Sequence, residues 1–65
     1  MIVRAKEKSR AIKRAVSELQ SLDVGHYGGY YPPYFEGGWW KVQVVCNFQE
    51  EGNCPSLDFQ VKRIQ

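Results

Sequence analysis

The segment Ser9–Leu22, SRAIKRAVSELQSL, predicts an amphipathic helix, and the rest of the expected fold is built around it. It contains no glycine or proline and is rich in strong helix formers. Its larger apolar residues recur at the i, i+3, i+4, i+7 spacing of one helix face: Ile12, Ala15, Val16, Leu19 and Leu22. Gly25 then acts as a helix terminator, so the helix is expected over about residues 9–23.

The start of this helix is compatible with two arrangements. If the helix begins near Ser9, the serine side chain caps its first turn. If it begins earlier, Lys8 falls in the apolar stripe and must extend its ammonium group past the edge of the core. The sequence does not choose between them.

The same end of the chain carries most of its positive charge. Residues 1–14 hold six Lys and Arg against one acid, a net charge of +5, whereas residues 15–65 hold three against six, a net charge of −3. Cations near the start of a helix oppose its dipole by about 0.3–1 kcal/mol each, so local stability does not explain them. They predict a surface for phosphate or for an acidic protein. The predicted cationic face consists of Lys6, Arg10, Lys13 and Arg14.

Farther along the chain, alternating residues predict a β-hairpin over about residues 39–49 and 56–64. Residues 50–53, EEGN, are expected to supply its turn. One set of alternate positions is apolar in each arm, as in half-buried antiparallel strands: Trp40, Val42, Val44, Cys46 and Phe48, then Leu57, Phe59 and Val61. The two apolar sets share one face if, for example, Val44 lies opposite Phe59.

These segments predict an α+β fold, with one amphipathic helix packed on a small antiparallel sheet in a single domain, residues 1–65. A two-stranded sheet is rarely stable by itself, so a third strand is expected. It can come from Met1–Val3, from part of Tyr30–Phe35, or from a second copy of the chain in a homodimer. The expected order is α-β-β, or β-α-β-β if Met1–Val3 pairs.

Between the helix and the hairpin, residues 25–38, GHYGGYYPPYFEGG, are predicted to form a loop, because five glycines and two prolines exclude a helix. Seven of the nine aromatic residues lie within residues 27–40. The residues predicted to stack on unpaired bases are Tyr27, Tyr30, Tyr31 and Tyr34. The residues predicted for an alternative protein contact are Tyr31, Tyr34, Phe35 and Trp39.

The sequence offers little material for catalysis or for metal binding. His26 is the single histidine and has no identifiable partner for acid–base chemistry. Cys46 and Cys54 lack the close spacing of zinc ligands, and we expect two separate thiols. We therefore expect no catalytic residue, no metal, no cofactor and no small-molecule substrate.

Hydropathy argues for a cytoplasmic protein without membrane association. No apolar run approaches the ~20 residues needed to cross a bilayer. The basic N-terminal residues are not followed by the apolar stretch of a signal peptide. An intracellular location also favours reduced cysteines.

The leading functional hypothesis is association with nucleic acid, either RNA or single-stranded DNA. The basic helix face would contact phosphates and the tyrosines would stack on bases. The alternative is a protein-binding adaptor or inhibitor that uses residues 27–40 and the hairpin edge, with the helix charge steering an acidic partner. No nucleic-acid-binding motif of defined spacing is present, so both hypotheses depend on composition.

Overall fold

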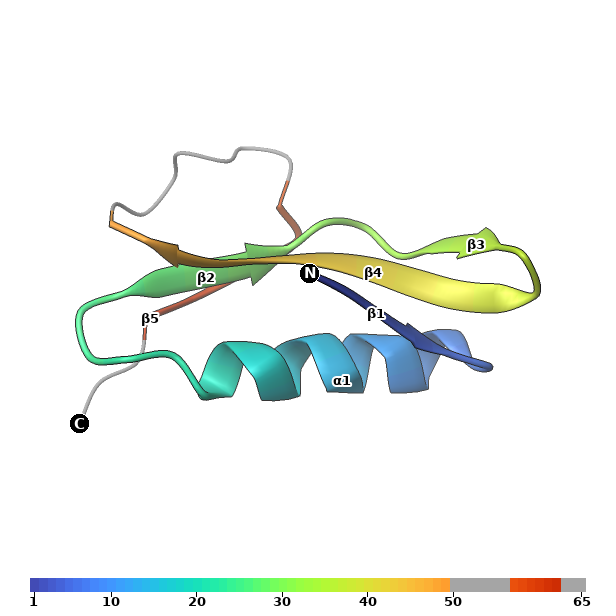
Figure 1. Ribbon diagram of the computed structural model, residues 1–65, viewed down its shortest axis with the longest axis horizontal. Coiled ribbons are helices and arrows are strands. Elements are labelled where there is room, and N and C mark those ends of the chain that lie inside the picture. Colours follow the sequence, from blue (N-terminus) through green and yellow to red (C-terminus); the bar gives the residue numbers. More distant parts are fainter. Residues whose placement is uncertain (50–56, 63–65) are drawn as a thin grey trace.

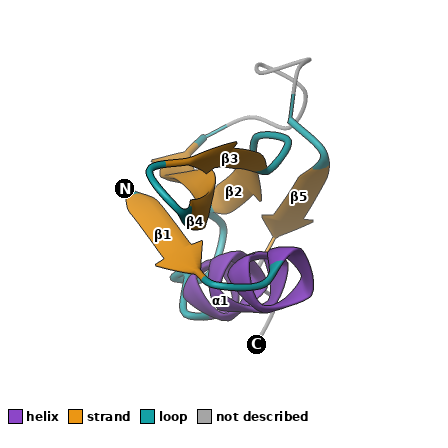
Figure 2. Ribbon diagram, turned by 90° about the vertical axis from the view of Figure 1, so that its right-hand side faces the viewer, coloured by secondary structure: helices purple, strands orange, loops and turns teal. Residues whose placement is uncertain are grey.

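The computed structural model describes residues 1–49 and 57–62, and in that part of the chain one helix packs against one face of an antiparallel sheet (Figure 1). The elements in chain order are β1 (Ile2–Ala5), α1 (Lys8–Gln20), β2 (Tyr27–Tyr30), β3 (Tyr34–Glu36), β4 (Trp39–Phe48) and β5 (Phe59–Lys62). The strand order is β1-β4-β2-β5, and β3 also pairs with β4. Figure 2 shows the sheet curving over the helix, with β1 and β5 on either side. The predicted α+β class is confirmed.

The helix starts one residue before Ser9, so Ser9 is not its cap. Glu7 precedes α1 in an extended conformation, with φ −118° and ψ 142°, and makes no side-chain capping hydrogen bond. Lys8 therefore occupies the first turn, and its Nζ lies 5.6 Å from the ring centroid of Trp40, as expected for a side chain that extends past the core edge. The helix ends at Gln20, where the hydroxyl of Ser21 donates to the carbonyl of Glu18 at 2.7 Å.

The core lies between one side of α1 and the centre of the sheet. Among the described residues, seven hydrophobic side chains are buried there, from β1, α1, the segment just after the helix and β4: Ala5, Ala11, Ala15, Leu19, Leu22, Val42 and Val44. Ile12 and Val16 are only half-buried, so the inward stripe is turned toward Ala11 compared with the prediction. Ala11 and Ala15 let the helix backbone approach the sheet closely, which leaves Ile12 and Val16 at the margin, whereas Leu19 is fully buried nearer the end of the helix.

The predicted hairpin between residues 39–49 and 56–64 is wrong. β5 pairs with β2, and β2 lies between β5 and β4. The predicted turn at residues 50–53 and Cys54 fall outside the described residues. The alternation of apolar residues fixes which face of the sheet a residue occupies, but not which strand lies beside it. The pattern was therefore compatible with the wrong strand pairing.

The true hairpin partner of β4 is the segment predicted to be a loop. β2 and β3 run antiparallel to β4 along one of its edges, with Tyr30 opposite Val44 and Glu36 opposite Trp39. Gly37 and Gly38 connect the two arms and have φ of 61° and 81°. Two consecutive residues with positive φ form the tight turn that suits the twist of a two-stranded ribbon, and glycine adopts that conformation without strain. β1 pairs along the other edge of β4, so the N-terminal strand of the β-α-β-β alternative is present.

Two bulges adjust the register of this long hairpin. Between the pairs Tyr30–Val44 and Tyr34–Lys41, three residues of one arm face two of the other. Pro32 and Pro33 lie in this bulge, where a missing N–H breaks no ladder bond. The second bulge is at Asn47, whose φ is 65°.

The Asn47 bulge corrects the prediction that Phe48 shares the helix-facing side with Cys46. The register shifts between Gly29 and Tyr27, so that Phe48 lies opposite Tyr27. The position of Gly28 faces the helix, because a Cβ there would lie 2.5 Å from a terminal methyl of Leu19. Its neighbour Tyr27 therefore points to the other side, and Phe48 stacks on Tyr27 there with ring centroids 6.3 Å apart.

The glycines of β2 allow this strand to fit between its neighbours, and they give a stability prediction. A Cβ on Gly29 would lie 2.5 Å from the backbone carbonyl of Phe59, which cannot move without breaking the β2–β5 pairing. We expect Gly29→Ala to lower the free energy of unfolding by about 2–3 kcal/mol. Gly28→Ala should lower it less, because the atoms closest to its Cβ would be the ends of two leucine side chains, and the nearest backbone atom, the carbonyl oxygen of Val45, would lie 3.0 Å away. Urea denaturation measures both, with the exposed Gln43→Ala as control. Equal losses for the two glycine variants would contradict the assigned pairing of β2 with β5.

Candidate nucleic-acid interface

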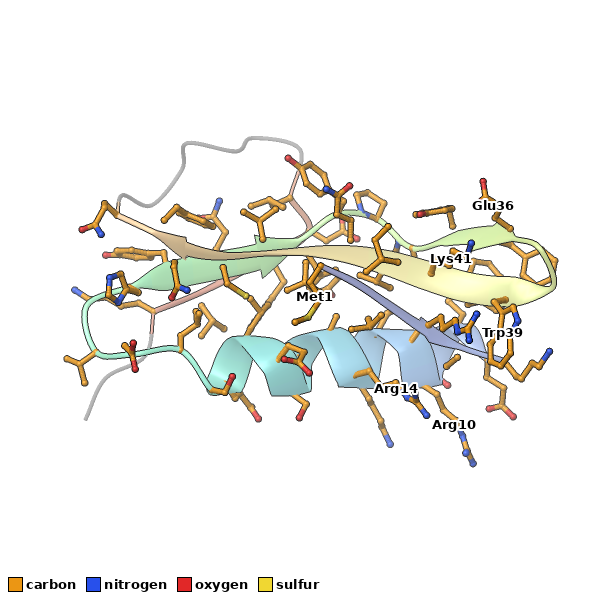
Figure 3. All side chains as sticks on the ribbon, in the orientation of Figure 1. Met1, Arg10, Arg14, Glu36, Trp39 and Lys41 are labelled. Atoms are coloured by element: carbon orange, nitrogen blue, oxygen red, sulfur yellow. The ribbon has the colours of Figure 1, made fainter. Side chains whose placement is uncertain are left out.

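The six cations of residues 1–14 gather at one end of the molecule. The first half of α1, the end of β1 and the β3–β4 turn all lie there, on the right of Figure 1. Figure 3 shows Arg10, Arg14 and Trp39 at this end, with both arginines pointing away from the sheet. The cations are Arg4 from β1, Lys6 from the connection, and Lys8, Arg10, Lys13 and Arg14 from α1. They divide into two groups with different surroundings.

The first group is the helix trio, Arg10, Lys13 and Arg14, which lines a surface pocket of about 350 Å³. Arg10 Nε lies 3.7 Å from the carboxylate of Glu7, and both side chains are about seventy per cent exposed, so this pair is loose and weakly stabilising. Within residues 1–49 and 57–62, Lys13 and Arg14 form no ion pair. The pocket is therefore open, positively charged and almost unneutralised.

The second group forms what we call the tryptophan cluster: Trp39, Trp40, Arg4, Lys6 and Lys8. Lys6 Nζ lies 3.9 Å and Arg4 Cζ 4.5 Å from the ring centroid of Trp39, and Lys8 Nζ lies 5.6 Å from that of Trp40. Such contacts contribute about 0.5–1 kcal/mol each at exposed sites. Lys6 was predicted to belong to the helix face, but it precedes α1 and lies on Trp39 instead.

The tip of the hairpin brings an exposed aromatic ring next to this cluster. Phe35 is 60 % exposed and meets the ring of Trp40 edge-on, with centroids 5.5 Å apart. All three residues of β3 are exposed. Glu36 accepts a hydrogen bond from the ammonium of Lys41 at 3.0 Å, which ties the two strands together. Phe35 thus offers a free ring beside the cations.

The tyrosines predicted to stack on bases do not share one surface with the helix trio. Tyr27 is stacked on Phe48, with Lys62 Nζ 5.4 Å from its ring centroid. Tyr30 packs against the core and lies 6.0 Å from Phe59, centroid to centroid. Tyr31 is half-buried, and Tyr34 is 39 % exposed on β3. Only Tyr34 therefore combines exposure with a position near the basic end.

Sequence reasoning missed the involvement of Arg4, Lys8 and Trp40. The available signal was the alternation of Arg4, Lys6 and Lys8, which places three cations on one side of an extended chain. Of these three cations, the sequence pattern assigns only Lys6 to a site, on a helix face that it does not join. It places Lys8 either before the helix or at the edge of the core.

The remaining reactive side chains do not come together. His26 Nδ1 is buried and has no hydrogen-bond partner in the described part of the chain, while its backbone N–H donates to the carbonyl of Asp23 at 3.2 Å. Cys46 is a half-buried free thiol beside the core. Across the described ranges, no three His, Cys, Asp or Glu side chains converge as metal ligands would.

Comparisons with known proteins give no family for this chain. No protein-family model, no curated protein and no solved structure matches it. The one described helix has 13 residues, and no helix in that part of the chain has the length and apolar character needed to cross a membrane. The surface described above is therefore the basis for a functional assignment.

We expect the helix trio to contribute almost nothing to folding. Lys13→Ala and Arg14→Ala should each change the free energy of unfolding by less than about 0.5 kcal/mol, because both side chains are exposed and unpaired in the described structure. Leu19→Ala should lower it by about 2–5 kcal/mol, because Leu19 is fully buried under the sheet. Urea denaturation of the three variants measures the contrast. A loss above 1 kcal/mol in either charge variant would assign it a structural role.

Proposed function

We propose that this protein associates with single-stranded nucleic acid, RNA or DNA, through the first half of α1 and the adjoining hairpin tip. The observation that carries the proposal is the helix trio, in which Arg10, Lys13 and Arg14 line one pocket with only the loose pair to Glu7. The phosphates of a nucleic-acid strand would neutralise these cations, and counterions would be released when the strand binds.

The placement of the other cations supports a role in binding over a role in folding. The first turn of α1 contains no acidic residue and begins with Lys8, opposite to what the helix dipole favours. Arg4 lies directly opposite Lys41 on the neighbouring strand, an arrangement that is unfavourable for like charges. Both placements oppose folding slightly, and a bound anion would reverse their effect.

Exposed rings at the hairpin tip, which lies at the same end of the molecule as the trio, support a single strand over a duplex. Phe35, and Tyr34 next to it, can each receive an unpaired base, a contact of about 1–3 kcal/mol per base. A duplex keeps its bases stacked inside, so it would use only the cations. In this proposal, Phe35 and Tyr34 at the hairpin tip stack on bases, and Tyr27, Tyr30 and Tyr31 do not.

The size of the basic surface limits the footprint to a few nucleotides. Arg10 and Arg14 lie about 6 Å apart along the helix axis, at 1.5 Å per residue. Residues 15–65 carry a net charge of −3 and would repel a longer strand. We therefore expect about three phosphate contacts on the helix and modest affinity.

Salt dependence tests the proposal directly. Three phosphate contacts predict that the logarithm of the binding constant falls with log salt at a slope of about −2, since each contact on a single strand contributes about −0.7. Fluorescence anisotropy with labelled oligouridylate and oligothymidylate at several salt concentrations measures this slope. Lys13→Glu should weaken binding about tenfold at low salt and reduce the slope by about 0.7.

Lys62→Glu is the matched control, because it makes the same charge change on β5 at the opposite end of the molecule (Figure 1). It should reduce affinity less than twofold. Equal losses in Lys13→Glu and Lys62→Glu would show a response to net charge alone. No binding of either oligonucleotide at low salt would rule the function out.

A second candidate is binding of an acidic protein segment at the edge of β3. The three residues of β3 are exposed, and among the described residues its outer edge pairs with no strand. An extended peptide could add to that edge while the cations attract its acids. Of the residues predicted for such a contact, Tyr34 and Phe35 are exposed, whereas Tyr31 and Trp39 are half-buried.

Polyglutamate of matched charge distinguishes the two candidates. The nucleic-acid proposal expects the oligonucleotide to bind at least tenfold more tightly than polyglutamate, because only the oligonucleotide has bases to stack. Equal affinities, with both lost in Phe35→Asp, would favour the protein candidate. The predicted homodimer is a separate matter that sedimentation of the free protein would decide.

A further inference from the structure

Trp39 carries an unusual concentration of positive charge for one aromatic ring. Lys6 Nζ and Arg4 Cζ lie 3.9 Å and 4.5 Å from its ring centroid. Lys41 is directly opposite Arg4 on the paired strand. Lys41 forms an ion pair with Glu36, whose carboxylate oxygen lies 3.0 Å from the ammonium nitrogen of Lys41. Two cations thus lie on one indole, and the carboxylate of Glu36 is already paired with Lys41, which leaves a local surplus of two positive charges on Arg4 and Lys6.

The ring is held in place, whereas the groups that cover it are free to move. Trp39 is the first residue of β4 and pairs with Glu36 across the two-glycine turn. Trp39 is half-buried, so its ring is partly fixed by its neighbours. Arg4 and Lys6 are exposed, their side chains are long, and Lys6 lies in the connection between β1 and α1. A competing ligand can therefore displace the cations without moving the strand.

The two components of this site match the two parts of a nucleotide. A planar base fits the face of an indole, and phosphate groups fit an arginine and a lysine that form no ion pair with any carboxylate in residues 1–49 and 57–62. Each cation lies on the ring at an exposed site, where such a contact is only weakly stabilising. A bound strand would supply a base that stacks on the indole in place of the cations. It would also supply phosphates that bind the two displaced cations.

Building on the proposed function, we propose that Trp39 is a covered stacking platform for one unpaired base. When a strand binds the helix trio, a base takes the place of Arg4 and Lys6 on the indole, and these two cations move to the phosphates on either side of that base. The exchange requires a base that can leave its neighbours, so it selects single strands. A polyanion without bases can draw off the cations but leaves the ring unstacked.

Fluorescence of a single indole tests the exchange. Trp40→Phe leaves Trp39 as the sole tryptophan in the full chain. We expect an oligouridylate of about eight nucleotides to quench its emission at saturation, and inorganic polyphosphate of equal charge to leave most of the emission intact. Trp39→Phe, which leaves Trp40 alone, is the matched control and should respond much less. Quenching of equal depth by both ligands would overturn the proposal.

Affinity gives an independent readout. Trp39→Leu should weaken oligouridylate binding about tenfold and leave polyphosphate binding within about twofold, because only the first ligand stacks. If Trp39→Leu does not fold, Arg4→Gln/Lys6→Gln serves instead: affinity for both ligands should fall, while oligouridylate still quenches Trp39. Loss of that quenching would overturn the proposal.

The outcomes separate this inference from the function on which it rests. Salt-sensitive oligouridylate binding with no change in Trp39 emission would overturn the stacking platform and leave the helix trio as the binding surface. No oligouridylate binding at low salt would overturn both. Loss of polyphosphate binding in Trp39→Leu would assign Trp39 a structural role in place of a stacking role.

Discussion

The structure depends on the contact between the inner side of α1 and the middle of β4. Val42 and Val44 are fully buried in one core cluster with Ala11, Ala15 and Leu19. β4 also forms hydrogen-bonded ladders along both edges, with β1 on one and with β2 and β3 on the other. A domain of this size buries a small core, so one central strand that contacts nearly every other element supplies most of its cohesion.

This contact also determines where the charges lie. Docking α1 along β4 brings the start of the helix to the same end as the β3–β4 turn (Figure 1). Lys8 of α1 therefore lies beside Trp40, and Arg4 and Lys6 lie on Trp39, although these rings come more than thirty residues later in the chain. The side of α1 that is not needed for the core is free to carry Arg10, Lys13 and Arg14. Packing and charge are thus divided between the two sides of one helix.

Several parts of the fold were predictable because they depend on local pattern. The amphipathic period identified α1, and the alternation of residues 40–46 identified the helix-facing side of β4. The pairing of β5 was not predictable, because the alternation of apolar residues does not show whether another strand lies between β4 and β5. Gly37-Gly38 between two arms was a recognisable hairpin signal that the glycine- and proline-rich composition obscured. Bulges such as the one at Asn47 have no reliable signature in a single sequence.

The sequence predicted the grouping of the helix cations, but it did not predict which aromatic rings lie near them. Arg10, Lys13 and Arg14 could be placed together because i, i+3 and i+4 positions on a helix are neighbours. Which rings lie beside them depends on the tertiary packing of the hairpin over the helix. Tyr27 stacks on Phe48, and Tyr30 packs at a tilt against Phe59. Both contacts arise only once β2 lies between β4 and β5.

The bulge at residues 31–33 has a consequence for how the length of this chain can vary. Three residues there span the distance that two span on β4, so the bulge contains one residue more than the pairing needs. A homologue lacking one of them would keep Tyr30 and Phe35 on the helix-facing side, with every flanking pair in place. A one-residue deletion inside β4, between Trp40 and Val45, would move the side chains on one side of the deletion to the opposite face of the sheet. Natural length variation in this hairpin should therefore concentrate at the two prolines.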